Sequence, residues 1–541
     1  MNIWLHIHRG GACYQTCPNM YVSKTKLLVG ALLVVSVAIA SCSDDAAPTG
    51  PELDSEPGEI EVTVEGVVRD KETEAVLDAA EVRIYRGGQN EMLASGSADS
   101  DGVYSVAFIL EDNDLPDELQ IKAELDAFAD YERGVRFARS VTHDIFLVAE
   151  DIERFAGGLG TADNPYLIGT IDHLQNIDEE LDSHFLQVND IDATETEQWH
   201  EGQGFIPIGT RVGQDDIGNR PFTGTYNGDG YEIYGLSIDR NQEVVGLFEL
   251  VRTGDIKGVT LRDIRVSGSG RWVGGLVGAM REGRIIDCQV NGEVSYTGER
   301  YGSGIALLAA LNQDGSNIKS SHVAGTLNNS FGGAGGITSL NGGGILSWRN
   351  NEITESSSDV DISARGPIGG IAGLSSGGFN GGVIRYSKAA GNIETTEPGP
   401  FIAGGLLGSN FGEIHNSYSV ATVTIKNQDD VDSDSVAGGL VGRNRGQIRH
   451  SYTASGTFGD GVTGGLVGEN DNGGELLDTY WDTEASGQND GVGVGKQVGA
   501  IGLTGDQMQG NAAAENMEGL DFQEIWRTVT GDYPALWWEE Q

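Results

Sequence analysis

The stretch AGGLVGRNRGQIRHSY, residues 437–452, decides the fold of this 541-residue chain because much of it is repeated. TGGLVGEN follows at 463–470, with the same two glycines, leucine, valine and third glycine. A phrase that recurs at a regular interval is typical of repeat architectures, in which each copy is one structural unit. The pattern predicts that equivalent residues of successive copies stack along a common axis.

The Gly-Leu or Gly-Ile step of this phrase recurs at intervals of 26 to 35 residues. A β-propeller needs about 40–50 residues for the four strands of a blade, so these units are too short for one. No helical period lies inside the units, which excludes helical solenoids. The copies are Gly246-Leu247, Gly275-Leu276, Gly304-Ile305, Gly336-Ile337, Gly370-Ile371, Gly405-Leu406, Gly439-Leu440 and Gly465-Leu466.

A second phrase follows each step, with an aliphatic residue and then a small side chain three residues later. The small residues are Cys288, Ser321, Ser356, Ser387, Ser417, Ser451 and Thr479. Each unit then supplies three short strands, which pair in parallel with those of the units above and below. The prediction is a right-handed parallel β-helix, with glycines at bends where φ is positive or where crowding forbids a Cβ.

The combined pattern GGLVG…G-x-I-x-x-S-Y resembles the GLUG motif, found in tandem in bacterial surface proteins and in non-catalytic parts of IgA-specific metallopeptidases. The resemblance implies a segment that opens and caps the β-helix at 152–243, GLUG repeats at 244–483 and a closing cap at 484–541. Helices are expected at 171–181 and about 504–517, because an open coil end exposes unpaired strand groups.

Residues 59–149 alternate apolar and polar residues over short runs that are separated by turn-forming residues, which predicts a small antiparallel β-sandwich. Its phrases resemble those of carboxypeptidase regulatory-like domains, which implies a non-catalytic spacer or binding platform. Asp99 and Asp101 are compatible with calcium binding, but a turn alone explains them.

The N-terminal residues 1–41 have the features of a secretory signal: Lys24 and Lys26, then a short apolar run. Met20 is the more natural start, so residues 1–19 are a candidate mis-assigned extension. The lipobox-like residues are Ile39, Ala40, Ser41 and Cys42. This resemblance to bacterial lipoproteins implies that Cys42 is lipidated and anchors the protein to the outer membrane, with residues 42–58 as an acidic tether and the protein exposed on the cell surface.

The chain carries 81 acidic against 34 basic residues, a formal net charge of −47. Nucleic acid is excluded as a partner, since phosphate binding needs clusters of Lys and Arg. Such an excess keeps a protein soluble through self-repulsion and suits a salty environment.

Catalytic motifs are not found in the sequence: there is no H-E-x-x-H, no G-x-S-x-G, no P-loop and no paired-cysteine zinc site. No cofactor is expected, although the alternating carboxylates of Asp430, Asp432 and Asp434 are compatible with structural calcium. Cys288 occupies the column of small residues and is expected to be a buried packing residue.

The residue after each small side chain should face outward, and at three successive units it is Tyr418, Tyr452 or Tyr480. An aromatic ladder of this kind is compatible with binding sugar rings or peptide, or with stabilising the sheet by stacking. The earlier units place Gln289, His322, Ser357 and Lys388 in the same column, which supplies no acidic pair for hydrolysis.

The function expected from the sequence is a non-catalytic, adhesin-like surface lipoprotein whose β-helix binds extracellular polysaccharide or protein. Two alternatives remain open: a carbohydrate-active β-helix enzyme, such as a polysaccharide lyase or hydrolase, and a structural component of the cell envelope.

Overall fold

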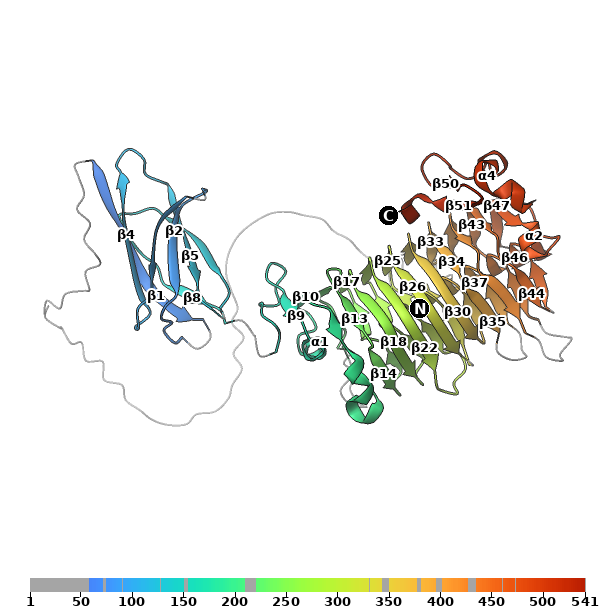
Figure 1. Ribbon diagram of the computed structural model, residues 1–541, viewed down its shortest axis with the longest axis horizontal. Helices are drawn as coiled ribbons and strands as arrows, with labels where there is room; N and C mark the ends of the chain where they lie inside the picture. The colour runs from blue at the N-terminus through green and yellow to red at the C-terminus, as the bar shows by residue number, and fades with distance from the viewer. Residues whose placement is uncertain are drawn as a thin grey trace, which may run out of the picture. The chain divides into compact units, whose positions relative to one another are not determined.

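The structure is a computed structural model that describes residues 58–540, apart from 72–73, 90, 127, 150–153, 210–219, 330, 343–349, 377–380, 396–400, 427–433, 460 and 472 (Figure 1). The signal segment, the lipobox with Cys42 and the tether up to residue 57 lie outside the described residues. Two of the three aspartates considered for calcium, Asp430 and Asp432, also lie outside them.

Residues 58–149 form a small β-sandwich, as predicted, with one mixed and one antiparallel sheet. The first sheet pairs β1 (Glu59–Asp70) with β4 (Val103–Glu111) in antiparallel and with β7 (Ser140–Thr142) and β8 (Ile145–Leu147) in parallel. The second sheet has the order β3 (Met92–Ser97), β2 (Glu81–Arg86), β5 (Glu118–Glu124), β6 (Tyr131–Arg136). Every second residue of β1 and β4 is buried in one apolar core, which explains the alternation in the sequence.

The second part of the described chain is a parallel β-solenoid with three faces (Figure 1), which confirms the predicted fold class. The first face contains β15 (Val244–Val245), β19 (Trp272–Gly274), β23 (Gly304–Ala306), β27 (Gly333–Gly335), β31 (Pro367–Gly369), β36 (Ile402–Gly404), β41 (Val436–Gly438) and β45 (Val462–Gly464). The second face contains β16 (Phe248–Arg252), β20 (Val277–Arg281), β24 (Ala309–Gln313), β28 (Thr338–Asn341), β32 (Ala372–Ser375), β37 (Leu407–Asn410), β42 (Val441–Asn444), β46 (Val467–Asn470) and β48 (Val492–Gly495).

The third face has at least two strands in each central coil. These strands are β17 (Asp255–Lys257), β18 (Thr260–Gly268), β21 (Arg284–Ile286), β22 (Gln289–Tyr296), β25 (Asn317–Lys319), β26 (His322–Asn329), β29 (Glu352–Thr354), β30 (Ser357–Ala364), β33 (Val383–Arg385), β34 (Lys388–Ala390), β35 (Asn392–Thr395), β38 (Glu413–His415), β39 (Tyr418–Ser419), β40 (Thr422–Ile425), β43 (Gln447–Thr453), β44 (Thr457–Gly459), β47 (Glu475–Asp482) and β49 (Ala500–Leu503). The prediction of three strands per unit was therefore too low, because the glycine corner splits the first phrase into two strands, as in β41 and β42.

Backbone crowding explains the glycines of the repeated phrase. A Cβ at Gly439 would lie 2.3 Å from the carbonyl oxygen of Gly465, and one at Gly405 would lie 2.1 Å from that of Gly439. Neither glycine has a positive φ. Of the two reasons that the sequence left open, close approach of the next coil is the one that applies here.

Positive φ occurs instead in a column of non-glycine residues on the third face, which lie between two strands in the earlier coils and inside β43 and β47 in the last two. Its members have φ between 45° and 55° and are Asp287, Ser320, Glu355, Tyr386, Asn416, His450 and Asp478. The left-handed residue turns the chain so that the side chain after it enters the coil and the next one leaves it.

The small residues directly after this column stack inside the coil in the predicted register. The N–H of Ser417 donates to Ser451 Oγ at 3.2 Å, and Ser451 Oγ donates to the carbonyl of Arg449 at 2.8 Å. The same pattern links Ser321, Ser356 and Ser387. Cys288 is fully buried at the start of this column, and burial raises the pKa of its thiol to about 12, so it is a packing residue as expected.

Short elements lie before and after the repeats. The opening segment contains β9 (Tyr166–Ile168), α1 (Ile171–Asn176), the 3₁₀ turn Ile177–Glu179, β10 (His184–Gln187), β11 (Ile191–Asp192), the 3₁₀ segment Thr194–Gly202, β12 (Thr225–Asn227), β13 (Glu232–Tyr234) and β14 (Ser237–Arg240). Thr170 caps α1 by accepting a hydrogen bond from the His173 N–H at 3.2 Å. The closing segment contains α2 (Thr483–Ser486), α3 (Gly505–Met508), α4 (Gly510–Asn516), β50 (Trp526–Val529), β51 (Asp532–Leu536) and the 3₁₀ turn Trp537–Glu540. Both predicted helices are present, although each is broken into shorter pieces.

Candidate binding grooves of the solenoid

The outward column of the third face has the register predicted from the sequence. Consecutive strands pair Gln289 with His322, His322 with Ser357, Ser357 with Lys388, Lys388 with Tyr418, Tyr418 with Tyr452 and Tyr452 with Tyr480. The column therefore runs from a polar part to an aromatic part along the solenoid axis.

The three tyrosines are stacked but not exposed. The rings of Tyr418 and Tyr452 are nearly parallel, with centroids 4.8 Å apart. Tyr418, Tyr452 and Tyr480 are only 7%, 0% and 2% exposed, because they pack under Met508, Met517, Leu520, Trp526 and Leu536 of the closing segment. The interpretation of this ladder as an open binding surface is thus corrected, since the far end of the same chain covers the rings. Figure 1 shows this segment, with α4, β50 and β51, lying against the β43–β47 side of the solenoid.

Each tyrosine hydroxyl also bonds to the covering segment. Tyr418 donates to Glu539 at 3.0 Å, Tyr452 donates to the carbonyl of Pro534, and Tyr480 accepts from the Gly519 N–H at 2.9 Å. Burial raises the pKa of all three hydroxyls above the ordinary tyrosine value, so they stay neutral. The aromatic part of the column is an intramolecular docking surface.

The polar part of the column is open and forms a groove of about 700 Å³ at the edge of the closing segment, which we call the lateral groove. Four successive coils contribute to it, and they span about 14 Å at ~4.8 Å per rung. It is lined by Ile286, Asp287, Gln289, Ser320, His322, Glu355, Ser357, Lys388, Trp538 and Glu539.

His322 and Trp538 form the aromatic wall of the lateral groove. Their rings stack with centroids 5.7 Å apart, and the Trp538 indole N–H donates to the carbonyl of Tyr386 at 2.7 Å. Burial lowers the pKa of His322 below its ordinary value, and the nearby Lys388 lowers it further. The imidazole is therefore neutral near pH 7, with Nδ1 2.7 Å from Ser357 Oγ.

The charged groups of the lateral groove are partly paired. Lys388 Nζ lies 2.7 Å from Glu539, and Lys319 lies 3.3 Å from Glu355. Ser320 Oγ donates to Glu355 at 3.2 Å. The sequence predicted the outward register of Gln289, His322, Ser357 and Lys388, but it did not indicate Trp538 and Glu539 as groove residues. The aromatic run GDYPALWW at 531–538 was the available signal.

A second groove, of about 400 Å³, lies over the first and second faces beside Arg271 and Trp272. We call it the arginine groove. The sequence did not indicate it, because its residues come from four coils and follow no motif.

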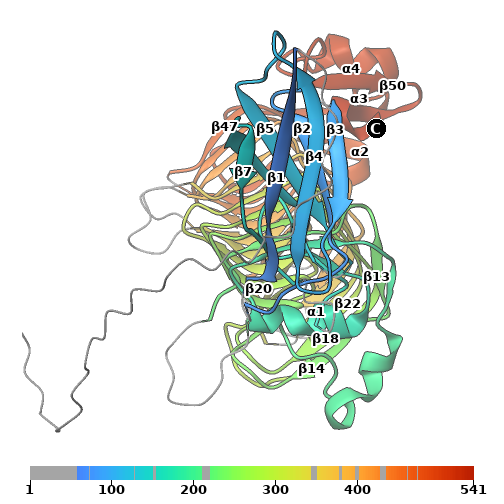
Figure 2. The ribbon, with the colours of Figure 1, turned by 90° about the vertical axis from the view of Figure 1, so that its left-hand side faces the viewer.

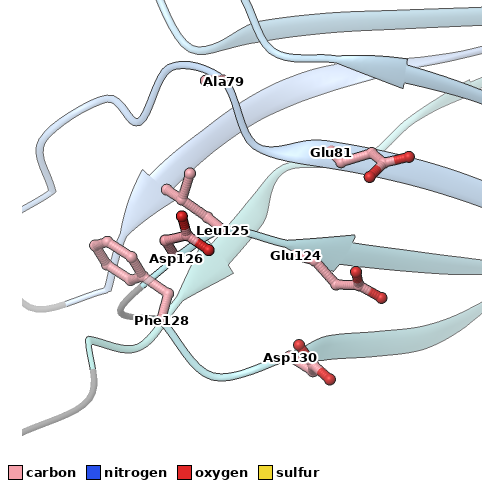
Figure 3. Close-up of a pocket in the computed structure, with 7 residues that line it drawn as sticks. All are labelled: Ala79, Glu81, Glu124, Leu125, Asp126, Phe128 and Asp130. Carbon is pink, nitrogen blue, oxygen red and sulfur yellow. The ribbon is translucent and has the colours of Figure 1, made fainter.

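The sandwich has an acidic pocket of about 530 Å³, and Figure 3 shows Asp126 beside Phe128 on one side of it and Glu81, Glu124 and Asp130 on the other. Arg83 pairs with both glutamates at 2.7 and 2.6 Å and lowers the pKa of Glu81. Asp99 accepts hydrogen bonds from the N–H groups of Asp101 and Val103, both at 2.9 Å, as the turn interpretation predicts.

Within the described part of the chain, no three His, Cys, Asp or Glu side chains come together in a way that could hold a metal ion. Asp434, the described member of the calcium candidates, is exposed.

Among the helices of the described residues, none is long and apolar enough to cross a bilayer. Figure 2 shows the ribbon of Figure 1 turned by 90° about the vertical axis, with the short helices α1 to α4 labelled.

Comparison with known proteins found two similar sequences. Halomucin of Haloquadratum walsbyi is 31% identical over 387 residues, which is 70% of this chain and 3% of halomucin. A "Putative Gly-rich membrane protein" of Evansella cellulosilytica is 40% identical over 134 residues, 24% of this chain and 15% of that protein. The chain thus spans a small fraction of both relatives, and no family model matches it.

Two solved structures resemble the chain weakly. A protein described as a "putative immunoglobulin A1 protease" from Bacteroides ovatus is 20% identical, with a TM-score of 0.41 over 71% of this chain and 96% of that one. An IgA1 protease is 14% identical, with a TM-score of 0.31 over 83% of this chain and 29% of that one. The strand topology shows that the chain is a β-solenoid protein, and the sequence matches show that it is distantly related to halomucin and to a Gly-rich membrane protein.

Proposed function

We propose that this protein is a non-catalytic, adhesin-like lipoprotein of the bacterial cell surface, anchored in the outer membrane through lipid on Cys42. In this proposal the solenoid consists of GLUG-type repeats, and the sandwich is a carboxypeptidase regulatory-like spacer. The relative named as a membrane protein supports a place at the cell envelope.

The lateral groove is the observation that carries the binding role. It crosses four coils, lies on a rigid stack of paired strands, and combines an aromatic wall with hydrogen-bonding side chains. A groove of about 14 Å suits an extended chain, such as an extracellular polysaccharide or peptide strand, better than a compact molecule.

The anchoring is tested on cells. Protease added to intact cells should remove the protein from the surface, and Cys42→Ser should abolish incorporation of labelled fatty acid. Protein that resists protease on intact cells, or that is labelled equally after Cys42→Ser, would contradict the proposed anchoring.

The binding role is tested on glycan and peptide arrays with the full chain. Asp287→Asn combined with Gln289→Ala removes exposed groups of the lateral groove, and Glu293→Gln changes a residue of the same strand that does not line it. We expect array signals that fall with the double variant and persist with Glu293→Gln. Equal signals for all three proteins, or no signal, would contradict the groove as the binding site.

A carbohydrate-active enzyme is the second candidate, because Asp287 and Glu355 line the same groove on either side of His322. They lie two coils apart, which corresponds to ~9.6 Å and is close to the carboxylate spacing of inverting hydrolases. Turnover of polysaccharides that is lost with Asp287→Asn and with Glu355→Gln separately would favour this candidate over a binding role.

A further inference from the structure

The arginine groove has a chemical character that the proposed function does not use. Arg271 and Trp272 lie at β19, Arg281 ends β20, Gln313 ends β24, and Ser339 belongs to β28. The lateral groove is on the third face, so the two grooves have no residue in common.

Glycine residues shape the floor of the arginine groove. Trp272 pairs with Gly304 of the next coil, and Gly304 pairs with Gly333 of the coil after that. A Cβ at Gly304 would lie 2.5 Å from the Trp272 ring and 2.6 Å from Ser339 Oγ. The absence of a side chain at Gly304 therefore lets the indole extend across the next coil.

The groove is positively charged in a strongly acidic protein. Its lining has two arginines and no carboxylate, whereas the whole chain has 81 acidic and 34 basic residues. Arg281 is 3.8 Å from Asp314, and its side chain is half exposed. The charge of the groove lining is therefore positive, whereas the net charge of the chain is strongly negative.

Arg271 differs from comparable arginines in lacking an acidic partner. Its guanidinium lies 5.3 Å from the centroid of the Trp272 ring, as Arg445 lies 5.4 Å from that of Phe411. Arg445 is held by Asp471 at 2.7 Å. For Arg271, no carboxylate lies within ion-pair distance among the residues that the structure describes. Its donors are thus available to an external anion.

Ser339 adds a polar group to the groove. Its residue lines the groove and is only 6% exposed, so its position is set by the packing around it. A serine hydroxyl can both donate a hydrogen bond to a ligand hydroxyl and accept one from it.

We propose that the arginine groove binds an anionic sugar unit of an acidic polysaccharide. Arg271 and Arg281 would hold its carboxylate or sulfate through charge-assisted hydrogen bonds. The partly exposed Trp272 ring would contact the C–H groups of the sugar ring, and Ser339 and Gln313 would bond to its hydroxyls. A peptide strand fits less well, because strands β19, β20, β24 and β28 are paired on both sides and offer no free edge for strand addition.

Calorimetric titration of the full chain with tetragalacturonate tests this proposal, with its methyl ester as the uncharged control and a sulfated carrageenan tetrasaccharide as the second anionic source. Sodium chloride at about 0.5 M screens the long-range repulsion between the acidic protein and the ligand. The variants are Arg271→Gln and Arg281→Gln, and Arg445→Gln is the matched control because it also lies over an aromatic ring.

We expect one or both charged tetrasaccharides to bind, and the methyl ester to bind at least about tenfold more weakly than tetragalacturonate if the carboxylate is the anchor. Arg271→Gln should weaken binding by about tenfold, and Arg445→Gln should leave it unchanged. Failure of both charged sugars to bind, equal binding of the ester, or equal loss with Arg445→Gln would overturn the proposal. Equal binding of tetraglutamate, or full displacement by an equal concentration of inorganic sulfate, would overturn the sugar specificity. None of these outcomes depends on the lateral groove.

Discussion

The open and covered parts of one column on the third face share a backbone and differ in what lies over them. Lys388 pairs directly with Tyr418, yet His322, Ser357 and Lys388 line a groove while the tyrosines after them are buried. The strands beneath are equivalent, so the difference comes from the closing segment, which covers the tyrosine rings and reaches the polar part with Trp538 and Glu539 at the groove edge. An outward position in a solenoid is thus a binding surface only where no other part of the chain uses it.

Tyr452→Ala, in the covered part of the column, should give the largest loss of unfolding free energy. The ring is fully buried between Tyr418, Trp526 and Tyr533, so its removal should cost about 3–5 kcal/mol of unfolding free energy and loosen the closing segment. Urea unfolding followed by tryptophan fluorescence measures this loss. Phe458→Ala, at a ring that is 52% exposed, is the control and should change the free energy by less than about 0.5 kcal/mol. Equal losses at both positions would contradict the covered column.

Substitutions in the buried column of small residues should cost similar unfolding free energy beneath the open part and beneath the covered part of the outward column. Ser451→Ala removes the acceptor of the Ser417 N–H, and Ser356→Ala removes that of the Ser321 N–H. Each should cost about 1–3 kcal/mol, because a buried donor loses its partner. Ser451→Cys should cost less than Ser451→Ala, since Cys288 occupies this column naturally. Urea unfolding measures these losses. If stability fell only with Ser451→Ala, the loss would come from the closing segment and not from the hydrogen bonds of the small-residue column.

The column of left-handed residues requires a positive φ in both the open and the covered part of the third face. Asp287, with φ 55°, tests this requirement in the open part. Asp287→Val should lower the unfolding free energy by about 1–2 kcal/mol more than Asp287→Gly, because a β-branched residue is strained at this φ. The midpoints of thermal unfolding of the two variants give the comparison. Equal midpoints would argue against a left-handed residue at this position.

The smallest effect should be the pH dependence of the stability that His322 contributes through its contact with Trp538. Burial lowers the pKa of His322, so the unfolded imidazole takes up a proton before the folded one as the pH falls. The stability that the neutral ring contributes is present above about pH 6.5 and is lost as the pH drops toward the folded pKa. The difference in stability between the native protein and His322→Gln should therefore shrink from pH 7.5 to 5. A difference that is constant over this range would contradict the buried neutral histidine.

Much of the solenoid could be predicted from sequence because its physics is local and repeated. Glycine recurs at each corner and a small side chain recurs in the buried column, and this spacing predicted the register of Ser417, Ser451 and Thr479. The left-handed column was not predicted, since Asp, Ser, Glu, Tyr, Asn and His share no side-chain chemistry and are united only by φ. The closing segment was placed near the end of the coil, but which side chains it would cover depended on contacts between residues about 40 to 150 positions apart.

The same limit applies to the two grooves. The strand residues of the lateral groove follow the register of the repeat, whereas Trp538 and Glu539 come from outside the repeat. The arginine groove depends on a missing side chain at Gly304 and on a missing acidic partner for Arg271. Neither feature is a sequence motif.

The most direct test of the stacked coils is a disulfide between adjacent rungs on the third face. Gln447 pairs with Glu475 of the next coil, and Glu413 pairs with Gln447, so Glu413 and Glu475 are two rungs apart. Gln447→Cys with Glu475→Cys places the two Cα atoms ~5 Å apart, within the range that a disulfide spans, and Glu413→Cys with Glu475→Cys places them ~10 Å apart. After mild oxidation, peptide mass spectrometry should find the bond between positions 447 and 475 and none between 413 and 475. A bond between 413 and 475, or no bond in the first variant, would contradict the coil-by-coil stacking.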